Sequence, residues 1–420
     1  MHNFEYRQGE LYCEQVPVSQ IAKQVGTPCY IYSHATLTRH IRAYDSAFKN
    51  IPHVIAFAMK ANSNLAILRL MATEGSGVDI VSGGELFRAL KAGVPPSKIV
   101  FAGVGKNADE IRDALKAGIL MFNIESSAEM HALNDVAASL GKTAPVALRI
   151  NPDIDPKTHP YISTGLKKSK FGIAADRALE EFRVASTLRH IHVVGVHAHI
   201  GSQLTEVTPF VESLKKVLAL VDTLKGQGIT IRYLNIGGGL GITYSDEKPP
   251  LPQELADAVS PLVKGLDLTL VMEPGRVIVG NAGILVTKAL YEKIGESKRF
   301  IIVDAAMNDL IRPSLYSAYH DIRPVSEALL HRPKHAVDVV GPVCESGDFL
   351  AKDRLLPEVK PGDLLAVMSA GAYGFVMASN YNSRPRVPEV LVKDGEVHVI
   401  RERESYDDLV RGETIPAFLN

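Results

Sequence analysis

The sequence is poor in cysteine, and the cysteines that it has lie far apart. Its 420 residues include only Cys13, Cys29 and Cys344. Three cysteines, an odd number without a recurring spacing, argue against a disulfide framework and against a cysteine-based zinc site. We therefore expect a protein that works in the reducing cytoplasm.

Excess charge and long apolar runs are lacking as well. The chain has 46 Lys and Arg against 47 Asp and Glu, a net charge of -1, and no 18 apolar residues follow one another. The first ten residues contain no apolar core of signal-peptide length. Such a chain has no charge field for nucleic acid or an anionic membrane surface. These features predict a soluble, non-secreted protein whose partner is a small molecule, with neither nucleic acid nor membrane as a partner.

Eight short apolar runs, rich in β-branched residues, recur along the first two thirds of the chain. Stretches with helical spacing separate them, such as 84–93, where Gly93 is a typical helix stop. Parallel strands covered on both faces are nearly continuous apolar runs, so this alternation predicts an α/β fold, a (β/α)8 barrel of the TIM type. An open, doubly wound sheet is the competing arrangement, and the count of eight favours closure. The runs lie at 54–59, 78–81, 99–101, 120–124, 146–150, 193–197, 233–236 and 268–272.

The pattern changes after about residue 283. Strand-like runs now follow one another without regular helices between them, and turn residues separate them. This predicts a second, mostly antiparallel β domain. The opening segment lacks the barrel's periodicity, so we assign 36–281 to the barrel and 1–35 with 282–420 to the β-rich domain, and the length suits two domains. The runs lie at 300–303, 337–340, 364–369, 387–392 and 397–401.

Polar residues follow the barrel runs at the ends where such barrels place their active sites. Lys60 follows the first run, three glycines at 237–239 follow the seventh, and Glu273 and Arg276 follow the eighth. A carboxylate can keep the pyridine nitrogen of pyridoxal phosphate protonated, an arginine can pair with its phosphate or with a substrate carboxylate, and a lysine can bind its aldehyde covalently. The three together indicate a pyridoxal phosphate site.

Each feature also has a simpler interpretation. Lys60 could end a strand in solvent, and the glycines could form only a tight loop. His197 and His199 alternate along a strand and so share a face, which is compatible with a metal site. A metal-dependent barrel would need further ligands at the other strand ends, but these carry Lys60 and Arg276, so we expect no metal.

The second domain contains three further polar groups of residues. Arg312 and Tyr316 are four residues apart and could grip a carboxylate from one helical turn, or could lie on a surface turn. Cys344 lies beside Glu345 in a turn-rich loop, which is unusual for an inert core cysteine. The segment 371–384, with Tyr373, could close a turn or line a site.

Taken in order, these motifs resemble the pyridoxal-phosphate-dependent decarboxylases with an alanine-racemase-like barrel, and within them the members that act on meso-diaminopimelate. The resemblance runs essentially from end to end. It rests on Gly-Thr-Pro at 26–28, Ala-Met-Lys-Ala-Asn at 58–62, His-Ile-Gly-Ser-Gln at 199–203, Gly-Gly-Gly at 237–239, Glu-Pro-Gly-Arg at 273–276, Arg-Pro-Ser-Leu-Tyr at 312–316, Cys-Glu-Ser at 344–346, Gly-Ala-Tyr at 371–373 and Asn-Tyr-Asn at 380–382.

The resemblance implies a carboxy-lyase that converts meso-2,6-diaminopimelate into L-lysine and CO2, the last step of lysine biosynthesis. Lys60 would carry pyridoxal 5'-phosphate, His199 would stack on its ring, and Glu273 would meet the pyridine nitrogen. The phosphate would be surrounded by Ser202, Gly237, Gly238, Gly239, Gly275, Arg276 and Tyr373. The distal end of the substrate would be bound by Arg276, Arg312, Tyr316, Glu345 and Tyr373.

The same resemblance implies a homodimer with shared active sites, because members of the family receive Cys344 and Glu345 from the neighbouring subunit. Either Cys344 or Lys60 could deliver the proton that completes the reaction. Asp79 and the segment 164–172 receive no role. The nearest alternative is a decarboxylase of the same fold that acts on ornithine, arginine or carboxynorspermidine.

Overall fold

The computed structural model describes residues 2–154 and 170–419, which form two compact units, Thr38–Ile278 and Met1–Leu37 together with Val279–Asn420. No helix of the described ranges is both long enough and apolar enough to cross a bilayer.

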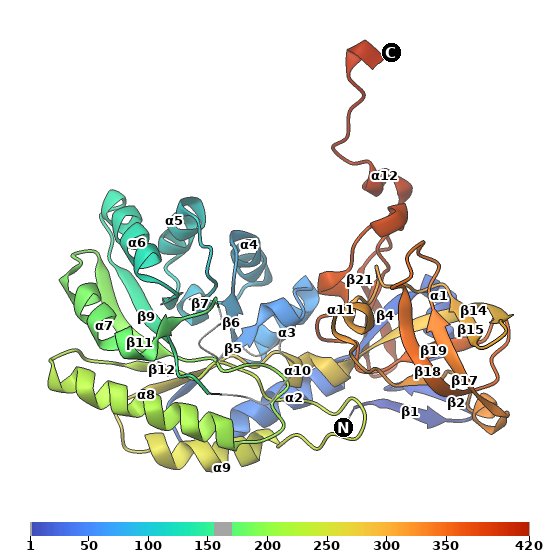
Figure 1. Ribbon diagram of the computed structural model, residues 1–420, viewed down its shortest axis with the longest axis horizontal. Coiled ribbons are helices and arrows are strands. Elements are labelled where there is room, and N and C mark those ends of the chain that lie inside the picture. The colour runs from blue at the N-terminus through green and yellow to red at the C-terminus, as the bar shows by residue number, and fades with distance from the viewer. Residues whose placement is uncertain (1, 155–169, 420) are drawn as a thin grey trace. The chain divides into compact units, whose positions relative to one another are not determined.

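The unit Thr38–Ile278 contains a closed barrel of eight parallel strands (Figure 1). Each strand pairs with the next, and the last pairs with the first, so the sheet has no open end. This confirms the predicted barrel and excludes the open sheet. The strands are β5 (His53–Ala58), β6 (Gly77–Ile80), β7 (Ile99–Phe101), β8 (Met121–Ile124), β9 (Ala144–Asn151), β11 (Ile191–His197), β12 (Tyr233–Asn235) and β13 (Thr269–Met272), and the short β10 (Ile173–Ala174) pairs with β9.

Helices follow the strands and lie around the outside of the barrel (Figure 1). Local sequence sets their ends: Ser82 caps α4 by accepting a hydrogen bond from the Glu85 amide, and Gly93 ends it in the left-handed conformation, as predicted. Inside the barrel, small and medium apolar side chains from six strands pack together. The helices are α2 (His34–Ala47), α3 (Leu65–Thr73), α4 (Gly83–Ala92), α5 (Ala108–Ala117), α6 (Ser127–Ser139), α7 (Ala178–Thr187), α8 (Thr208–Gly226), α9 (Pro252–Val263) and α10 (Arg276–Val279).

The other unit is built on a mostly antiparallel sheet, as predicted. Its strand order is β18-β17-β15-β14-β4-β20-β21, and β19 pairs with both β14 and β16. Only the pairs β15–β17 and β4–β20 are parallel among the described strands of this sheet. The strands are β4 (Cys29–Ser33), β14 (Gly283–Ile294), β15 (Arg299–Val303), β16 (Ile322–Pro324), β17 (Lys334–Val340), β18 (Phe349–Pro357), β19 (Leu364–Val367), β20 (Glu389–Lys393) and β21 (Glu396–Arg401).

The beginning of the chain belongs to this β-rich unit. Strand β4 lies between β14 and β20. A small sheet of β1 (Phe4–Arg7), β2 (Glu10–Cys13) and β3 (Val16–Pro17), with helix α1 (Val18–Val25), completes the N-terminal part. Its apolar side chains, such as Leu11 and Ile21, share one core with Ile284 and Val390 from the C-terminal part. Burial of this shared core ties the two ends of the sequence together.

Candidate active site

The barrel brings most of its predicted site residues to the C-terminal ends of its strands. Lys60 lies in a short 3-10 turn, η1 (Met59–Ala61), directly after β5. Glu273 follows β13, and its amide donates a hydrogen bond to the Gly237 carbonyl beyond β12 (2.9 Å). Parallel strands of one closed sheet must end at the same rim, which is why residues more than 200 positions apart meet here.

Glu273 is buried and held by hydrogen bonds. Its Oε1 accepts bonds from Asn235 Nδ2 (2.6 Å) and Asn123 Nδ2 (3.2 Å), and His197 Nε2 lies 3.6 Å from Oε2. Burial acts to raise the pKa of Glu273, but the adjacent His197, with a smaller contribution from Lys60, holds it well below the usual value. The barrel therefore presents an ionised carboxylate in a buried position.

The glycine loop and His199 fit against each other. Gly237 has φ +68°, and a Cβ there would lie 2.6 Å from His199 Nδ1; a Cβ on Gly238 would lie 2.0 Å from the Glu273 carbonyl oxygen. The Gly238 amide donates a hydrogen bond to His199 Nδ1 (3.3 Å). Desolvation, together with Arg149 and Lys60, lowers the pKa of His199 well below its usual value, so the ring is neutral. A side chain at Gly237 would displace the imidazole, and one at Gly238 would displace the backbone of Glu273.

Arg276 is held at the same rim. Its Nη2 and Nε donate hydrogen bonds to Ser202 Oγ (2.9 and 3.3 Å), and Nη1 donates one to the Tyr244 hydroxyl (2.6 Å). The guanidinium is buried and always charged. Ser202 and Arg276 thus meet as the sequence predicts, whereas Tyr244 was not predicted, because no regular run marks its loop.

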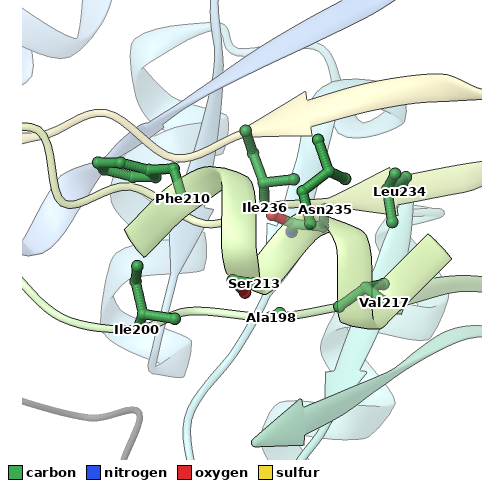
Figure 2. A pocket seen from close by; sticks show the side chains of 9 residues that line it. Ala198, Ile200, Phe210, Ser213, Val217, Leu234, Asn235 and Ile236 are labelled. Carbon is green, nitrogen blue, oxygen red and sulfur yellow. The ribbon is translucent and has the colours of Figure 1, made fainter. Parts of the chain in front are cut away.

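The segment that carries His199 is supported from outside the barrel by α8. Figure 2 shows side chains of α8 lying over the residues that follow β11 and β12. Phe210, Ser213 and Val217 line one side of a space bounded on the other by Ile200 and Ile236. Its volume is about 10 Å³, room for about one water molecule. This space is therefore a packing gap rather than a ligand site.

A second buried ion pair lies at the ends of β8 and β9. Arg149 Nη1 donates to Glu125 Oε1 (2.7 Å), and Glu125 Oε2 accepts from the Gly172 amide (2.9 Å). The guanidinium also lies 4.7 Å from the centre of the Phe171 ring. Neither Arg149 nor Glu125 was predicted as a site residue. The feature of the sequence that could have indicated Arg149 is that this arginine lies inside an otherwise apolar run. Gly172 closes the segment 164–172, of which 164–169 lie outside the described residues.

The buried donor and acceptor groups of the rim fit pyridoxal phosphate. An ionised carboxylate suits a protonated pyridine nitrogen, a neutral imidazole suits the face of an aromatic ring, and the glycine loop beside Arg276 suits a phosphate. Among residues 2–154 and 170–419 no three His, Cys, Asp or Glu side chains come close enough to hold a metal ion. Of the two histidines that could suggest a metal, His197 lies beside Glu273 and His199 beside the glycine loop.

The β-rich unit gathers a second set of predicted residues. Arg312 and Tyr316 begin and end the short helix α11 (Arg312–Tyr316). The Arg312 guanidinium is buried, with its carbon 6.0 Å from the ring centres of both Tyr316 and Tyr373. Its Nε also donates to His320 Nε2 (3.3 Å). A guanidinium close to two phenols is suited to bind a carboxylate.

The loop with Cys344 and Glu345 is tied to the same helix. Ser314 Oγ of α11 donates to the Gly347 carbonyl (2.5 Å), and the Cys344 amide donates to Asn382 Oδ1 (2.8 Å). The Cys344 side chain is exposed, whereas the two other cysteines are buried. The thiol and the Glu345 carboxylate are thus displayed on the surface of this unit.

Comparisons with known proteins agree on one family. Residues 34–280 match the family model described as "Pyridoxal-dependent decarboxylase, pyridoxal binding domain". The chain is 54% identical to the diaminopimelate decarboxylase of Pseudomonas aeruginosa, over 99% of both chains, and 52% identical to that of Aquifex aeolicus, over 97% and 96%.

Solved structures give the same result. The diaminopimelate decarboxylase of Helicobacter pylori complexed with L-lysine is 47% identical, with a TM-score of 0.90 over 94% of this chain and 98% of that one. The enzyme of M. jannaschii in co-complex with L-lysine is 41% identical, with a TM-score of 0.94 over the whole of both chains.

Proposed function

The chain belongs to the diaminopimelate decarboxylases, pyridoxal-phosphate-dependent carboxy-lyases, and from this membership we propose how its residues carry out the decarboxylation of diaminopimelate to lysine. The reacting end of meso-diaminopimelate is its D-configured α-carbon, and the products are L-lysine and CO2. Bound pyridoxal phosphate supplies a ring that accepts the electron pair left when CO2 departs.

The barrel residues hold and tune the cofactor. Lys60 would bind it covalently, the His199 ring would stack on it, and the ionised Glu273 would keep its pyridine nitrogen protonated. The observation that carries this proposal is the buried position of the Glu273 carboxylate, which accepts hydrogen bonds from two asparagines and lies 3.6 Å from His197. The phosphate would be held by Ser202, Gly237, Gly238, Gly239, Gly275 and Arg276 of the barrel and by Tyr373.

The residues of the β-rich unit determine the substrate specificity. The distal end of meso-diaminopimelate carries both a carboxylate and an ammonium group. Arg312, close to Tyr316 and Tyr373, suits the carboxylate, and Glu345 suits the ammonium. Arg276 contributes from the barrel. A substrate without a distal carboxylate would leave the buried Arg312 charge unpaired, which disfavours ornithine.

We infer a homodimer in which Cys344 and Glu345 act in the partner's active site. The exposed position of the thiol supports this inference. Either Cys344 or Lys60 then supplies the proton that replaces CO2 on the α-carbon. The three unpaired cysteines support a reducing, cytoplasmic location.

A substrate panel tests the proposed function. Purified enzyme is supplied with pyridoxal phosphate and with meso-diaminopimelate, ornithine, arginine or carboxynorspermidine in turn, while CO2 and the amine product are measured. We expect L-lysine from meso-diaminopimelate at a rate far above any other. A faster reaction with one of the other three would assign the chain to the rival specificity.

A further inference from the structure

Asp79 is a buried carboxyl group to which the proposed mechanism gives no role. It lies in β6 with its side chain only 1% exposed, and neither of its carboxyl oxygens has a hydrogen-bond partner among the described residues. Its nearest cation is Lys60, whose Nζ lies 3.8 Å from Oδ2. A buried polar group without a hydrogen-bond partner is costly, so its presence at this position points to a function.

The surroundings separate Asp79 from the other buried carboxyl group of the rim. Glu273 receives two amide donors and lies beside His197, which stabilises its ionised form. Asp79 receives no donor, so its ionised form would be poorly solvated. Of these two carboxyl groups, Glu273 is therefore the ionised one and Asp79 the protonated one.

The charged groups that face Asp79 also affect its pKa. Burial raises the pKa of Asp79 well above its usual value, the negative charge of Glu273 raises it further, and Glu85 adds to it; Lys60 and Arg149 oppose them. Glu85 itself is held by the Val81 amide (2.6 Å). Asp79 thus retains its proton at a pH at which an exposed carboxyl group has lost it.

We propose that Asp79 stores the proton that Lys60 gains and loses in each catalytic cycle. This rests on the proposed role of Lys60 as the residue that binds the cofactor. When the substrate amine displaces Lys60, the amine of Lys60 takes the proton: the O–H bond of Asp79 breaks, an N–H bond forms at Nζ, and an ammonium–carboxylate pair remains. When Lys60 binds the cofactor again, Nζ returns the proton to the Asp79 oxygen.

The geometry allows this exchange without solvent. The Lys60 side chain is flexible and 42% exposed, so a small rotation closes the 3.8 Å gap to hydrogen-bonding distance. Charge is conserved within the pair, because a neutral amine and a neutral acid become an ammonium and a carboxylate. Asp79 is therefore a positioning and proton-storing partner of Lys60 rather than a group that touches the substrate.

Product exchange tests the proposal separately from decarboxylation. L-Lysine is bound to the holoenzyme and then diluted out, and the recovery of the cofactor's visible absorbance is followed by stopped flow between about pH 6.5 and 9.5, the range below the usual lysine pKa. This recovery requires Lys60 to lose its proton but involves no CO2. The variants are Asp79→Asn, Asp79→Glu and, as control, Glu181→Gln, which neutralises a buried carboxyl group on α7.

For wild type and Glu181→Gln we expect recovery rates that change little with pH. For Asp79→Asn we expect a rate at least about tenfold lower near neutral pH, with the deficit shrinking as rising pH lets solvent remove the Lys60 proton. Asp79→Glu, which keeps an acid, restores the pH-independent rate at least in part.

A deficit in Asp79→Asn that is the same at every pH would show a structural role and overturn the proposal, as would recovery identical to wild type. An unresponsive wild-type chromophore would instead refute the proposed function, and this inference with it. A responsive wild type with an unaltered Asp79→Asn variant refutes the inference alone.

Discussion

Replacing Glu273 by glutamine removes the negative charge that the mechanism requires and leaves the shape of the side chain unchanged. The amide oxygen of glutamine can still accept the hydrogen bonds of Asn235 and Asn123, which now reach Oε1 at 2.6 and 3.2 Å. We therefore expect Glu273→Gln to fold normally and to bind pyridoxal phosphate. The neutral amide, however, no longer favours the protonated pyridine nitrogen.

The expected loss of kcat depends on the stage of the reaction at which negative charge develops on the cofactor ring. The ring becomes an electron acceptor only as CO2 leaves, so the carboxylate stabilises the transition state more than the bound substrate. Loss of one such buried electrostatic group costs about tenfold to a thousandfold in kcat, or about 1.4 to 4 kcal/mol. Because the pKa of Glu273 lies well below its usual value, the carboxylate stays ionised through the assay range, and the acid limb of the wild-type pH profile belongs to another group.

The assay compares kcat for CO2 release with the affinity for pyridoxal phosphate, measured by titrating cofactor into stripped protein. We expect kcat to fall by at least about tenfold while cofactor affinity changes by less than about threefold. The control is Glu181→Gln, which neutralises a buried carboxyl group on α7. An unchanged kcat, or a loss of affinity as large as the loss of kcat, would refute the reasoning and make Glu273 a structural residue.

Three further predictions concern the β-rich unit. Arg312→Ala should lower kcat/KM for meso-diaminopimelate by about tenfold to a hundredfold, the value of a charge-assisted hydrogen bond, with unchanged cofactor affinity; equal losses of both would contradict its role in substrate binding. Mixing inactive Lys60→Ala and Glu345→Ala subunits should restore activity toward roughly a quarter of wild type, since about half of the dimers are mixed and each mixed dimer has one intact site. No recovery despite demonstrated subunit exchange would show that each chain builds its own site. Burial raises the pKa of Asp309 to about 7. The folded chain thus holds this proton to higher pH than the unfolded chain, whose pKa is about 3.9, so stability falls as pH rises from about 4 to about 7. Asp309→Asn should flatten this decline in Tm, and parallel curves for the two proteins would disprove it.

The barrel could be predicted because its strands are buried on both faces. All eight runs became strands, and the polar residues just after them, such as Lys60 and Glu273, lie at the rim, where parallel strands must end together. What the sequence predicts least well are polar residues within the runs. The sequence alone does not identify Asn123 in β8 and Arg149 in β9 as site residues, because only the fold brings their partners close to them.

The β-rich unit shows a different limit. Strand β18 was not predicted, because Lys352, Asp353 and Arg354 interrupt its apolar pattern. It lies at the end of the sheet order, where charged side chains are tolerated and protect an exposed edge. The cluster of Arg312, Tyr316 and Tyr373 required the structure as well, since α11 is too short to show periodicity and Tyr373 is 57 positions from Tyr316 in the sequence.

The most direct test of the central claim is to locate the cofactor on the chain. The holoenzyme is reduced with borohydride, digested, and its pyridoxyl-bearing peptide is identified by mass spectrometry. We expect a visible chromophore before reduction and a single labelled residue, Lys60, afterwards. A label on another lysine, or no chromophore in protein supplied with pyridoxal phosphate, would contradict the central claim.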